Sequence, residues 1–171
     1  EKINSFKRNK NRSKVKIIKN FCEKDKFEEI QKIILGSNFP FYFSDGVADF
    51  EPTNEFYFTH TFYRDYQPTS PYYKLLIPII DIIKPKSLIR IKANLYPRTE
   101  KLHHHKKHED FDFDNYGLVL SLNDCDGGTQ IGDKFIPSIA NQAIIFKANV
   151  PHNSTTCTDK KARFNINFNY I

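Results

Sequence analysis

The chain lacks a long apolar run. Its longest oily stretch, residues 75–83, is interrupted by Pro78 and Asp81, whereas a helix that crosses a bilayer needs roughly 20 consecutive apolar residues. The sequence therefore excludes a transmembrane helix, and we expect no membrane partner.

Cysteine is scarce. Cys22, Cys125 and Cys157 are the three cysteines, an odd number without CxxC spacing. This argues against a disulfide framework and against a structural zinc site. A reducing compartment is favoured, and we expect a cytoplasmic protein. Nothing in the chain resembles a signal peptide, but it begins at Glu1 without Met, so the removal of one is left open.

A chain of 171 residues is most simply one domain. Its 39% hydrophobic residues, with 16 Phe and 9 Tyr, are enough for a sizeable core and exclude a disordered or collagen-like chain. No internal repeat and no second linker is present. We therefore expect a single globular domain over residues 21–171, preceded by a separate N-terminal segment.

Positive charge is concentrated in that N-terminal segment, residues 1–20. The net charge of the whole chain is +6. Residues 1–20 carry eight Lys or Arg and one acid, a net of +7, which leaves −1 for the other 151 residues. We expect a basic arm and a first strand here. The arm is either a solvated terminus, which we favour, or a phosphate-binding arm.

Two helical segments are expected in the N-terminal half. Residues 25–35 place apolar side chains on one face and end before Gly36. A second helical segment begins at Ser70, which can cap it, with Pro71 at the first helical position. Pro78 then forces a kink or a break into two short helices. Residues 15–21 and 56–62 are expected to be strands.

From residue 88 the pattern changes to short strands separated by Pro, Gly, Asn and Asp. It predicts a roll or sandwich of antiparallel strands, with the two helices packed outside one sheet. The expected strands are residues 88–96, 116–122, 129–131, 134–137, 142–147 and 163–170.

One short motif points to a metal. His108-x-Asp110 is the only His-x-Asp in the chain. Side chains at i and i+2 of a strand share a face, so both can bind one ion. His152, which follows the expected strand 142–147, is the natural third ligand. Two His and one carboxylate leave open coordination positions, an arrangement typical of non-haem Fe(II) oxygenases; zinc is the alternative metal.

The last strand adds a cationic residue. Apolar and polar residues alternate strictly after Arg163, so Arg163, Asn165 and Asn167 share a face opposite to Phe164, Ile166 and Phe168. An arginine on the polar face of a strand can hold a carboxylate through two parallel hydrogen bonds. A surface salt bridge is the alternative role for Arg163.

Together these residues resemble the Fe(II)- and 2-oxoglutarate-dependent dioxygenases, in particular the compact prolyl-4-hydroxylase-like branch of bacteria and phages. The resemblance covers about residues 88–171. The residues that carry it are, in order, Asn94-Leu95-Tyr96-Pro97, His108-x-Asp110, Asn123 with Gly127-Gly128-Thr129, Phe146, Pro151-His152 and Arg163.

The resemblance implies a mainly β double-stranded β-helix, a jelly roll, whose mouth holds iron on His108, Asp110 and His152. It places Arg163 and Tyr96 on the distal carboxylate of 2-oxoglutarate. Asn94 is assigned to the carboxylate that chelates iron, as in the Asn-x-Tyr pair of the AlkB-like nucleic-acid demethylases. Asn165 also falls at a cosubstrate position, although relatives often have Ser or Thr there.

The implied activity is hydroxylation of a substrate with 2-oxoglutarate and dioxygen, with Fe(II) as cofactor and ascorbate as reductant. Halogenating relatives lack a carboxylate at the position of Asp110, so halogenation is not expected. The implied location is the cytoplasm, that of the host if the chain is phage-encoded. The substrate is a protein side chain such as proline, or a small molecule. One alternative is an AlkB-like demethylase that binds nucleic acid through the basic arm and through the aromatic-rich segment 39–73, which could stack bases. Another is a non-catalytic jelly-roll binding or structural module.

Three further residue groups have simple structural explanations. His60, between two threonines in an aromatic strand, is expected to be a hydrogen-bonded structural histidine. Gly127-Gly128 is expected to form a turn with positive φ, and it lacks the features of a phosphate loop. Phe111 and Phe113 are expected to pack in the core, while Asp112 and Asp114 are solvated or bridging.

Overall fold

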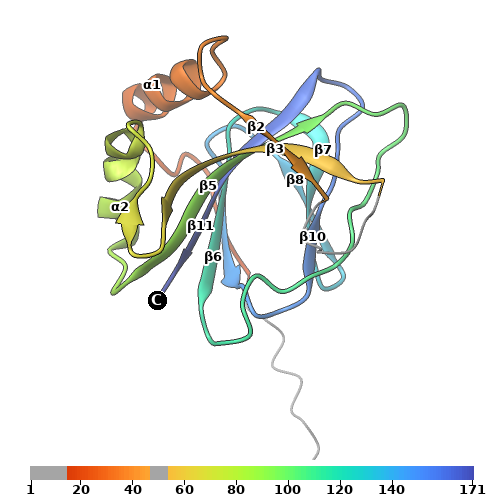
Figure 1. Ribbon diagram of the computed structural model, residues 1–171. Coiled ribbons are helices and arrows are strands. Elements are labelled where there is room, and N and C mark those ends of the chain that lie inside the picture. Colours follow the sequence, from red (N-terminus) through yellow and green to blue (C-terminus); the bar gives the residue numbers. More distant parts are fainter. Residues whose placement is uncertain (1–14, 47–53) are drawn as a thin grey trace, which may run out of the picture.

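The computed structural model describes residues 15–46 and 54–171. Most of the basic arm therefore lies outside the described residues. Two antiparallel sheets face each other (Figure 1). The larger has the order β1 (Lys16–Ile18), β9 (Ala143–Lys147), β6 (Tyr116–Ser121), β11 (Ala162–Tyr170), β5 (Leu88–Pro97), β3 (Phe56–Arg64) and β2 (Tyr42–Asp45), with β4 (Gln67–Pro68) paired to β3. The smaller consists of β10 (His152–Ser154), β7 (Cys125–Ile131) and β8 (Lys134–Ser138).

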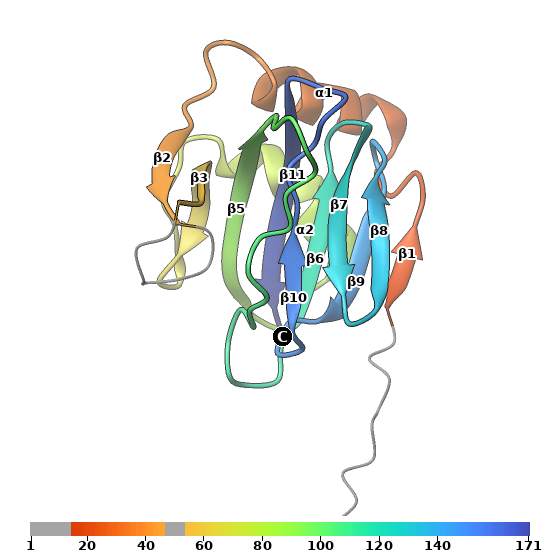
Figure 2. The ribbon, with the colours of Figure 1, turned by 90° about the vertical axis from the view of Figure 1, so that its right-hand side faces the viewer.

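This arrangement confirms the expected mainly β roll of antiparallel strands. Figure 2 looks onto the smaller sheet, with β10, β7 and β8 in front of the larger one. Apolar residues of the two sheets meet on one side of the roll, where they form a small core of Val119, Ile131, Ile136, Ile144, Phe146 and Ala148. Strands 42–45, 67–68 and 152–154 were not predicted, because they are short and have no clear alternation.

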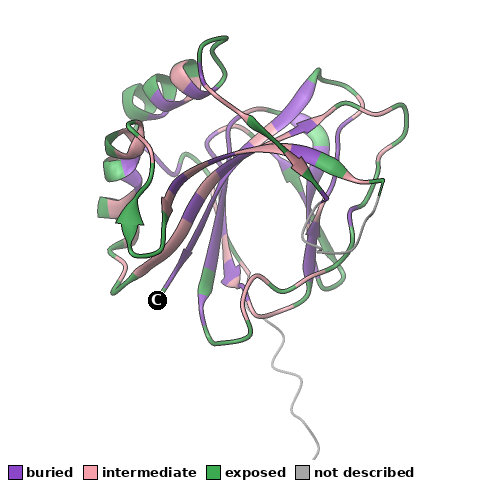
Figure 3. Ribbon diagram, viewed as in Figure 1, coloured by how far each residue is buried: buried purple, intermediate pink, exposed green. Residues whose placement is uncertain are grey.

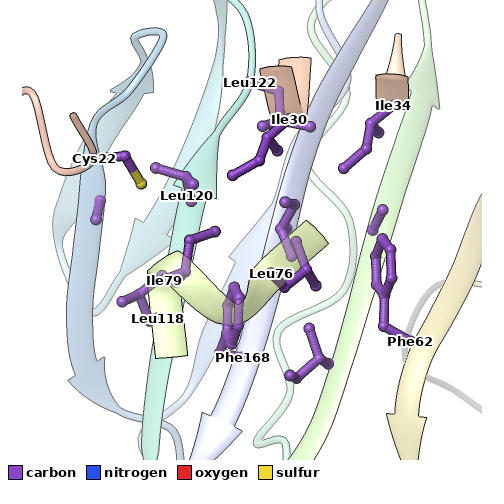
Figure 4. Packing of buried hydrophobic residues seen from close by; sticks show 14 of the residues in the cluster. Cys22, Ile30, Ile34, Phe62, Leu76, Ile79, Leu118, Leu120, Leu122 and Phe168 are labelled. Atoms are coloured by element: carbon purple, nitrogen blue, oxygen red, sulfur yellow. The ribbon is translucent and has the colours of Figure 1, made fainter. Parts of the chain in front are cut away.

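The helices lie against the outer face of the larger sheet (Figures 1 and 4). They are α1 (Lys24–Ile34), the 3-10 turn η1 (Tyr73–Leu76) and α2 (Ile77–Ile83). Their buried residues, such as Ile30 and Ile79, join one hydrophobic core with Leu118 and Phe168 of the sheet. The outward faces of the helices are exposed (Figure 3). No helix of residues 15–46 and 54–171 is long and apolar enough to cross a membrane.

Proline divides the second helical segment as the sequence predicts. Pro78 is at the start of α2 and η1 precedes it, because proline lacks an amide hydrogen and fits only a first helical turn. Helix formation begins later than expected, at Tyr73. Ser70 instead stabilises the preceding turn, since its Oγ accepts a hydrogen bond from the amide of Tyr72 at 3.0 Å.

β5 and β11 pair antiparallel in the middle of the larger sheet and give it two chemically different faces. Ile91 and Ala93 of β5, with Ile166 and Phe168 of β11, belong to the core under the helices. The alternate residues face the interior of the roll. They form four cross-strand pairs: Tyr96 with Arg163, Asn94 with Asn165, Lys92 with Asn167 and Arg90 with Asn169. We call these eight residues the polar ladder.

The prediction of a turn at Gly127-Gly128 is wrong. Both residues lie within β7, and the described glycines with positive φ are Gly46 and Gly132. Close backbone approach requires the glycines instead. A Cβ on Gly127 would lie 2.1 Å from the carbonyl oxygen of Thr156, a distance that no side chain tolerates.

Gly127→Ala is accordingly expected to lower the free energy of unfolding by more than about 3 kcal/mol, because the backbone must move to relieve the clash. Gly132→Ala is the matched control. Its residue has φ +55° but nothing within 4 Å, so only the left-handed backbone penalty of about 1 kcal/mol applies. Urea denaturation of the two variants compares them, and equal losses would contradict the packing argument.

The prediction that Phe111 and Phe113 pack in the core is also wrong. Phe113 is 43% exposed, and the two rings pack against each other at the surface, 5.4 Å apart. The guanidinium of Arg90 lies 5.1 Å from the Phe111 ring. Asp114 behaves as expected, since it is exposed and forms an ion pair with Lys147 at 2.7 Å.

Candidate metal centre

Backbone pairing brings the three expected metal ligands together. His108 and His152 form an isolated bridge, in which each amide donates to the other's carbonyl at 2.9 Å. The amide of Asp110 donates to the carbonyl of Ala148 at 3.0 Å. One ligand atom from each of His108, Asp110 and His152 lies within 4.8 Å of the others. The sequence pattern predicts a strand at His108 and Asp110. In the structure their segment is not a regular strand, but it lies beside β10 and pairs with it at His108.

Backbone carbonyls orient both imidazoles. Nδ1 of His152 lies 2.8 Å from the carbonyl oxygen of Val150, and Nδ1 of His108 lies 3.3 Å from that of Lys106. Because a carbonyl only accepts, each Nδ1 carries the proton. The two Nε2 atoms then face Oδ1 of Asp110, at 3.4 Å from His108 and 3.7 Å from His152. Electron-rich atoms that converge in this way need a proton or a metal cation between them, so the donor set fits a divalent ion.

Two residues that the sequence did not suggest hold Asp110 in place. Asn169 donates to Oδ2 of Asp110 at 2.8 Å, and Nη2 of Arg90 lies 3.4 Å from Oδ1. Burial raises the pKa of Asp110, but the adjacent groups His108, His152 and Arg90 outweigh burial and hold that pKa well below its usual value. Asn169 continues the alternation of Arg163, Asn165 and Asn167, so that pattern contained a signal for it.

A cavity opens beside the three ligands, inside the roll. The polar ladder supplies one wall of it through Lys92, Asn94, Tyr96, Asn165 and Asn167. The remaining lining residues are His108, Asp110, His152, Tyr57, Val119, Thr129 and Ser154. The candidate metal ligands, Tyr96, Asn94 and Asn165 therefore share one cavity. Tyr57 and Lys92 were not predicted.

Arg163 lies behind the wall of this cavity, against the lining residues Tyr96 and Thr129. Its side chain is 1% exposed, and it donates to the carbonyl of Thr155 at 3.2 Å and to Oγ1 of Thr129 at 3.0 Å. Its guanidinium is 5.3 Å from the ring of Tyr96, and its Nε has no hydrogen-bond partner. No carboxylate of the described residues forms an ion pair with it. Burial lowers the pKa of Arg163. A buried guanidinium without a carboxylate partner would be stabilised by a bound anion.

The other expected cosubstrate contacts are adjacent to Arg163. Asn94 donates to Oδ1 of Asn165 at 2.8 Å, while Oδ1 of Asn94 is buried and has no partner. The ring of Tyr96 stacks on Tyr57, with centroids 5.4 Å apart. Asn94 therefore has an unused acceptor beside the cavity, and buried polar groups are ordinarily satisfied.

The remaining motif residues support the site. Asn123 accepts from the amide of Phe164 at 2.9 Å and donates to the carbonyl of Ala162 at 3.0 Å, which holds the chain on either side of Arg163. Phe146 packs edge-on against His152, with centroids 4.8 Å apart. Both interactions fix residues that line the cavity or lie beside it.

Two further histidines have structural roles. His60 lies 2.7 Å from both the carbonyl of Pro40 and Oγ of Ser70, which agrees with the structural role expected for it. His105 is 4% exposed, and its Nδ1 lies 2.9 Å from Oγ of Ser154. It is not part of the group of possible metal ligands. Burial lowers the pKa of His105 to about 4.

His105 makes the stability of the protein depend on pH. The unfolded chain takes up a proton at this residue near pH 6.5 but the folded chain only near pH 4, so stability is lost as the pH falls through this window. When the pH is lowered from 7.5 to 4, the free energy of unfolding of the wild type is expected to fall by about 3 kcal/mol more than that of His105→Asn. Urea denaturation at several pH values measures this difference. His104→Asn, at an exposed position, is the control, and its free energy of unfolding should change with pH as that of the wild type does. If His105→Asn also changed as the wild type does, His105 would not be the source of the pH dependence.

Sequence comparison identifies no relative: no protein-family model matches the chain, and no curated protein matches it. Solved structures do match. A 2OG-Fe(II) oxygenase family oxidoreductase from Burkholderia pseudomallei superposes with a TM-score of 0.68 at 10% identity, over 91% of this chain and 84% of that one.

Two prolyl hydroxylases are also similar in structure. That of Trichoplax adhaerens, solved with a hypoxia inducible factor peptide fragment, has a TM-score of 0.64 at 14% identity, over 92% of this chain and 83% of its own. The prolyl-4-hydroxylase of Pseudomonas putida has a TM-score of 0.59 at 13% identity, over 93% of both chains. At the level of the fold, these similarities confirm the resemblance on which the sequence analysis relied: the chain has the jelly-roll fold of the 2-oxoglutarate and Fe(II) oxygenases.

Proposed function

We propose that this protein is an Fe(II)- and 2-oxoglutarate-dependent oxygenase that hydroxylates its substrate. One observation carries the proposal: the His108, Asp110 and His152 group lines a cavity, and a buried guanidinium without a carboxylate partner, that of Arg163, lies behind the cavity wall against Tyr96 and Thr129. A fold alone does not determine function, but this pair of features fits one cofactor and one cosubstrate.

The three ligands suit ferrous iron. Two imidazoles and one carboxylate on one side of an ion leave several coordination positions open for small molecules. The fixed Nδ1 protons leave both Nε2 atoms free to bind, and Asn169 holds the carboxylate of Asp110 in place. Partners of this kind orient metal ligands and raise metal affinity.

The cosubstrate is a dicarboxylate, and the wall of the cavity offers the groups that it needs. Arg163 would bind the distal carboxylate, with Tyr96 beside it. Asn94 and Asn165 lie next along the polar ladder, where they would hydrogen bond to the rest of the molecule. A guanidinium binds a carboxylate with two directed hydrogen bonds, so it positions the ligand as well as neutralising it.

Iron and 2-oxoglutarate, when bound, supply the oxidising power for dioxygen chemistry, while the protein supplies binding, orientation and a dry environment. Burial of Arg163 and Asp110 keeps water away from the charges that position the reactants. Because Asp110 fills the third ligand position with a carboxylate, we expect the product to be hydroxylated and not halogenated.

Succinate formation tests this proposal. Protein loaded with Fe(II) is mixed with 2-oxoglutarate, ascorbate and dioxygen, and succinate is quantified against His152→Ala under the same conditions. We expect succinate from the wild type alone, at a slow rate until a substrate is added. A wild type that binds Fe(II) and 2-oxoglutarate but forms no succinate would instead favour a non-catalytic jelly-roll module.

The substrate is proposed by analogy. Prolyl hydroxylases share the fold, and one of them was solved with a peptide, so a protein side chain such as proline is a first candidate. The nucleic-acid alternative depended on the basic arm, most of which lies outside the described residues, and on the aromatic-rich segment 39–73. The structural similarities reported above do not support it.

A further inference from the structure

The cavity contains a second cation that neither the metal ligands nor Arg163 explain. Lys92 lines the same cavity, and its ammonium donates to the hydroxyl of Tyr57 at 3.0 Å and lies 5.4 Å from that ring's centroid. No carboxylate among the described residues forms an ion pair with it. Burial lowers the pKa of Lys92 to about 8, which leaves it mostly protonated at pH 7. The carboxylate of Asp110 acts on it only from beyond ion-pair distance, so a closer anion would stabilise the ammonium further.

Asn167 provides a complementary group next to Lys92. The two residues are directly opposite on β11 and β5, and both line the cavity. Oδ1 of Asn167 is buried and has no hydrogen-bond partner. A ligand that satisfies both side chains must therefore present an anionic group to Lys92 and a hydrogen-bond donor to Asn167. An α-amino carboxylate has both groups on neighbouring atoms.

The polar ladder separates Lys92 from the expected site of the cosubstrate. Lys92 is four residues from Tyr96, the ladder partner of Arg163, which corresponds to about 13 Å along a strand. The pair after Lys92 is Arg90 with Asn169, and this pair holds Asp110, so Lys92 lies toward the metal ligands. The proposed cosubstrate contacts end at Asn94 and Asn165, one pair before Lys92, which leaves Lys92 for a second anion.

We propose that Lys92, Tyr57 and Asn167 form a substrate subsite that binds an α-carboxylate with its neighbouring N–H group, so that the substrate is an amino acid or the C-terminal residue of a peptide. The carboxylate would be bound by Lys92 and Tyr57 and the N–H group by Asn167. The inference deepens the proposed function and rests on it for the reaction, although not for the binding itself.

Calorimetric titration tests the subsite without catalysis. The protein is saturated with Mn(II) and 2-oxoglutarate in the absence of dioxygen. It is then titrated with the twenty free L-amino acids, with the same residues at the C-termini of tripeptides, and with the carboxamide of each compound. We expect at least one carboxylate to bind, and its carboxamide to bind at least about tenfold more weakly. Comparison of the free amino acids with the tripeptides shows whether the site binds a free amino acid or the C-terminal residue of a peptide.

Variants assign the binding to Lys92. Lys92→Gln is expected to lower the affinity for the carboxylate ligand by at least about tenfold, and Lys92→Arg to lower it by less. The exposed control Lys101→Gln should leave it unchanged. Retained 2-oxoglutarate binding shows that each variant is folded. The proposal is overturned if no carboxylate binds, if the carboxamide binds equally well, or if Lys92→Gln weakens 2-oxoglutarate as strongly as loss of Arg163 does.

The same titrations on metal-free protein without 2-oxoglutarate separate this inference from the proposed function. Carboxylate binding that depends on Lys92 supports the subsite there as well. If such binding occurs in a protein that fails to bind 2-oxoglutarate under any condition, only the proposed function is refuted. If 2-oxoglutarate binds and the carboxylates do not, only the subsite is refuted.

Discussion

Arg163→Met is expected to raise the Kd for 2-oxoglutarate by about 100-fold or more and to leave the affinity for Fe(II) nearly unchanged. The substitution removes a buried, charge-assisted contact to a carboxylate, which is worth about 2 to 5 kcal/mol. Arg163 belongs to no metal ligand's hydrogen-bond network, since its partners are Thr155 and Thr129. Titration of the anaerobic protein with each ligand measures both affinities.

A stability measurement distinguishes this role of Arg163 from a structural one. In the absence of ligand the guanidinium is buried without an anion, and a methionine removes that cost while it replaces the aliphatic part of the arginine side chain. We therefore expect the ligand-free variant to unfold within about 1 kcal/mol of the wild type. Arg163→Lys keeps the charge but not the planar fork, so its Kd should be intermediate. Equal losses of metal and cosubstrate affinity would indicate a folding defect and contradict the assignment.

His108→Ala, His152→Ala and Asp110→Asn are each expected to lower Fe(II) affinity by more than about 100-fold. Removal of one of three protein ligands from an open site leaves too few to hold a divalent ion, and loss of a mere supporting partner already costs about 10- to 100-fold. Asp110→Asn also removes the anionic ligand while it preserves the size of the side chain. Competition with a coloured chelator under anaerobic conditions gives the affinities.

The same segment of the chain offers matched controls. Asp114, which is exposed and paired with Lys147, and His104, which is exposed, lie close in sequence to the ligands but outside the group that converges. Asp114→Asn and His104→Ala should bind Fe(II) as the wild type does. If any of the three ligand variants kept the full affinity, that residue would not be a ligand.

Much of the site followed from local patterns. The strict alternation after Arg163 placed Arg163, Asn165 and Asn167 on one face, because successive side chains of a strand point to opposite sides. That face now lines the interior of the roll, while Ile166 and Phe168 belong to the core under the helices and Phe164 packs against it. The effect of Pro78 was equally predictable, because a missing amide hydrogen acts within one helical turn.

Other features depended on pairing between distant segments. His108 reaches His152 through reciprocal backbone hydrogen bonds across 44 residues of sequence, although the segment is not a regular strand. Arg90 and Lys92 lie on the cavity face of a strand whose partners could not be assigned in advance. Only the register with Asn169 and Asn167 shows which of them supports Asp110 and which remains available for a ligand.

The sequence by itself determined the kinds of chemical group in the site and the faces on which they lie: a His-x-Asp pair, a later histidine and a polar strand that begins at Arg163. These depend on periods of a few residues. The tertiary structure alone decided that a carbonyl of Thr156 excludes a side chain at Gly127 and that Phe113 is exposed. It also decided that Arg163, which is buried, and Lys92, which is partly buried, form no ion pair with a carboxylate of the described residues. Such facts depend on strand register and on close contacts between distant segments, which the two-residue repeat of a strand does not specify.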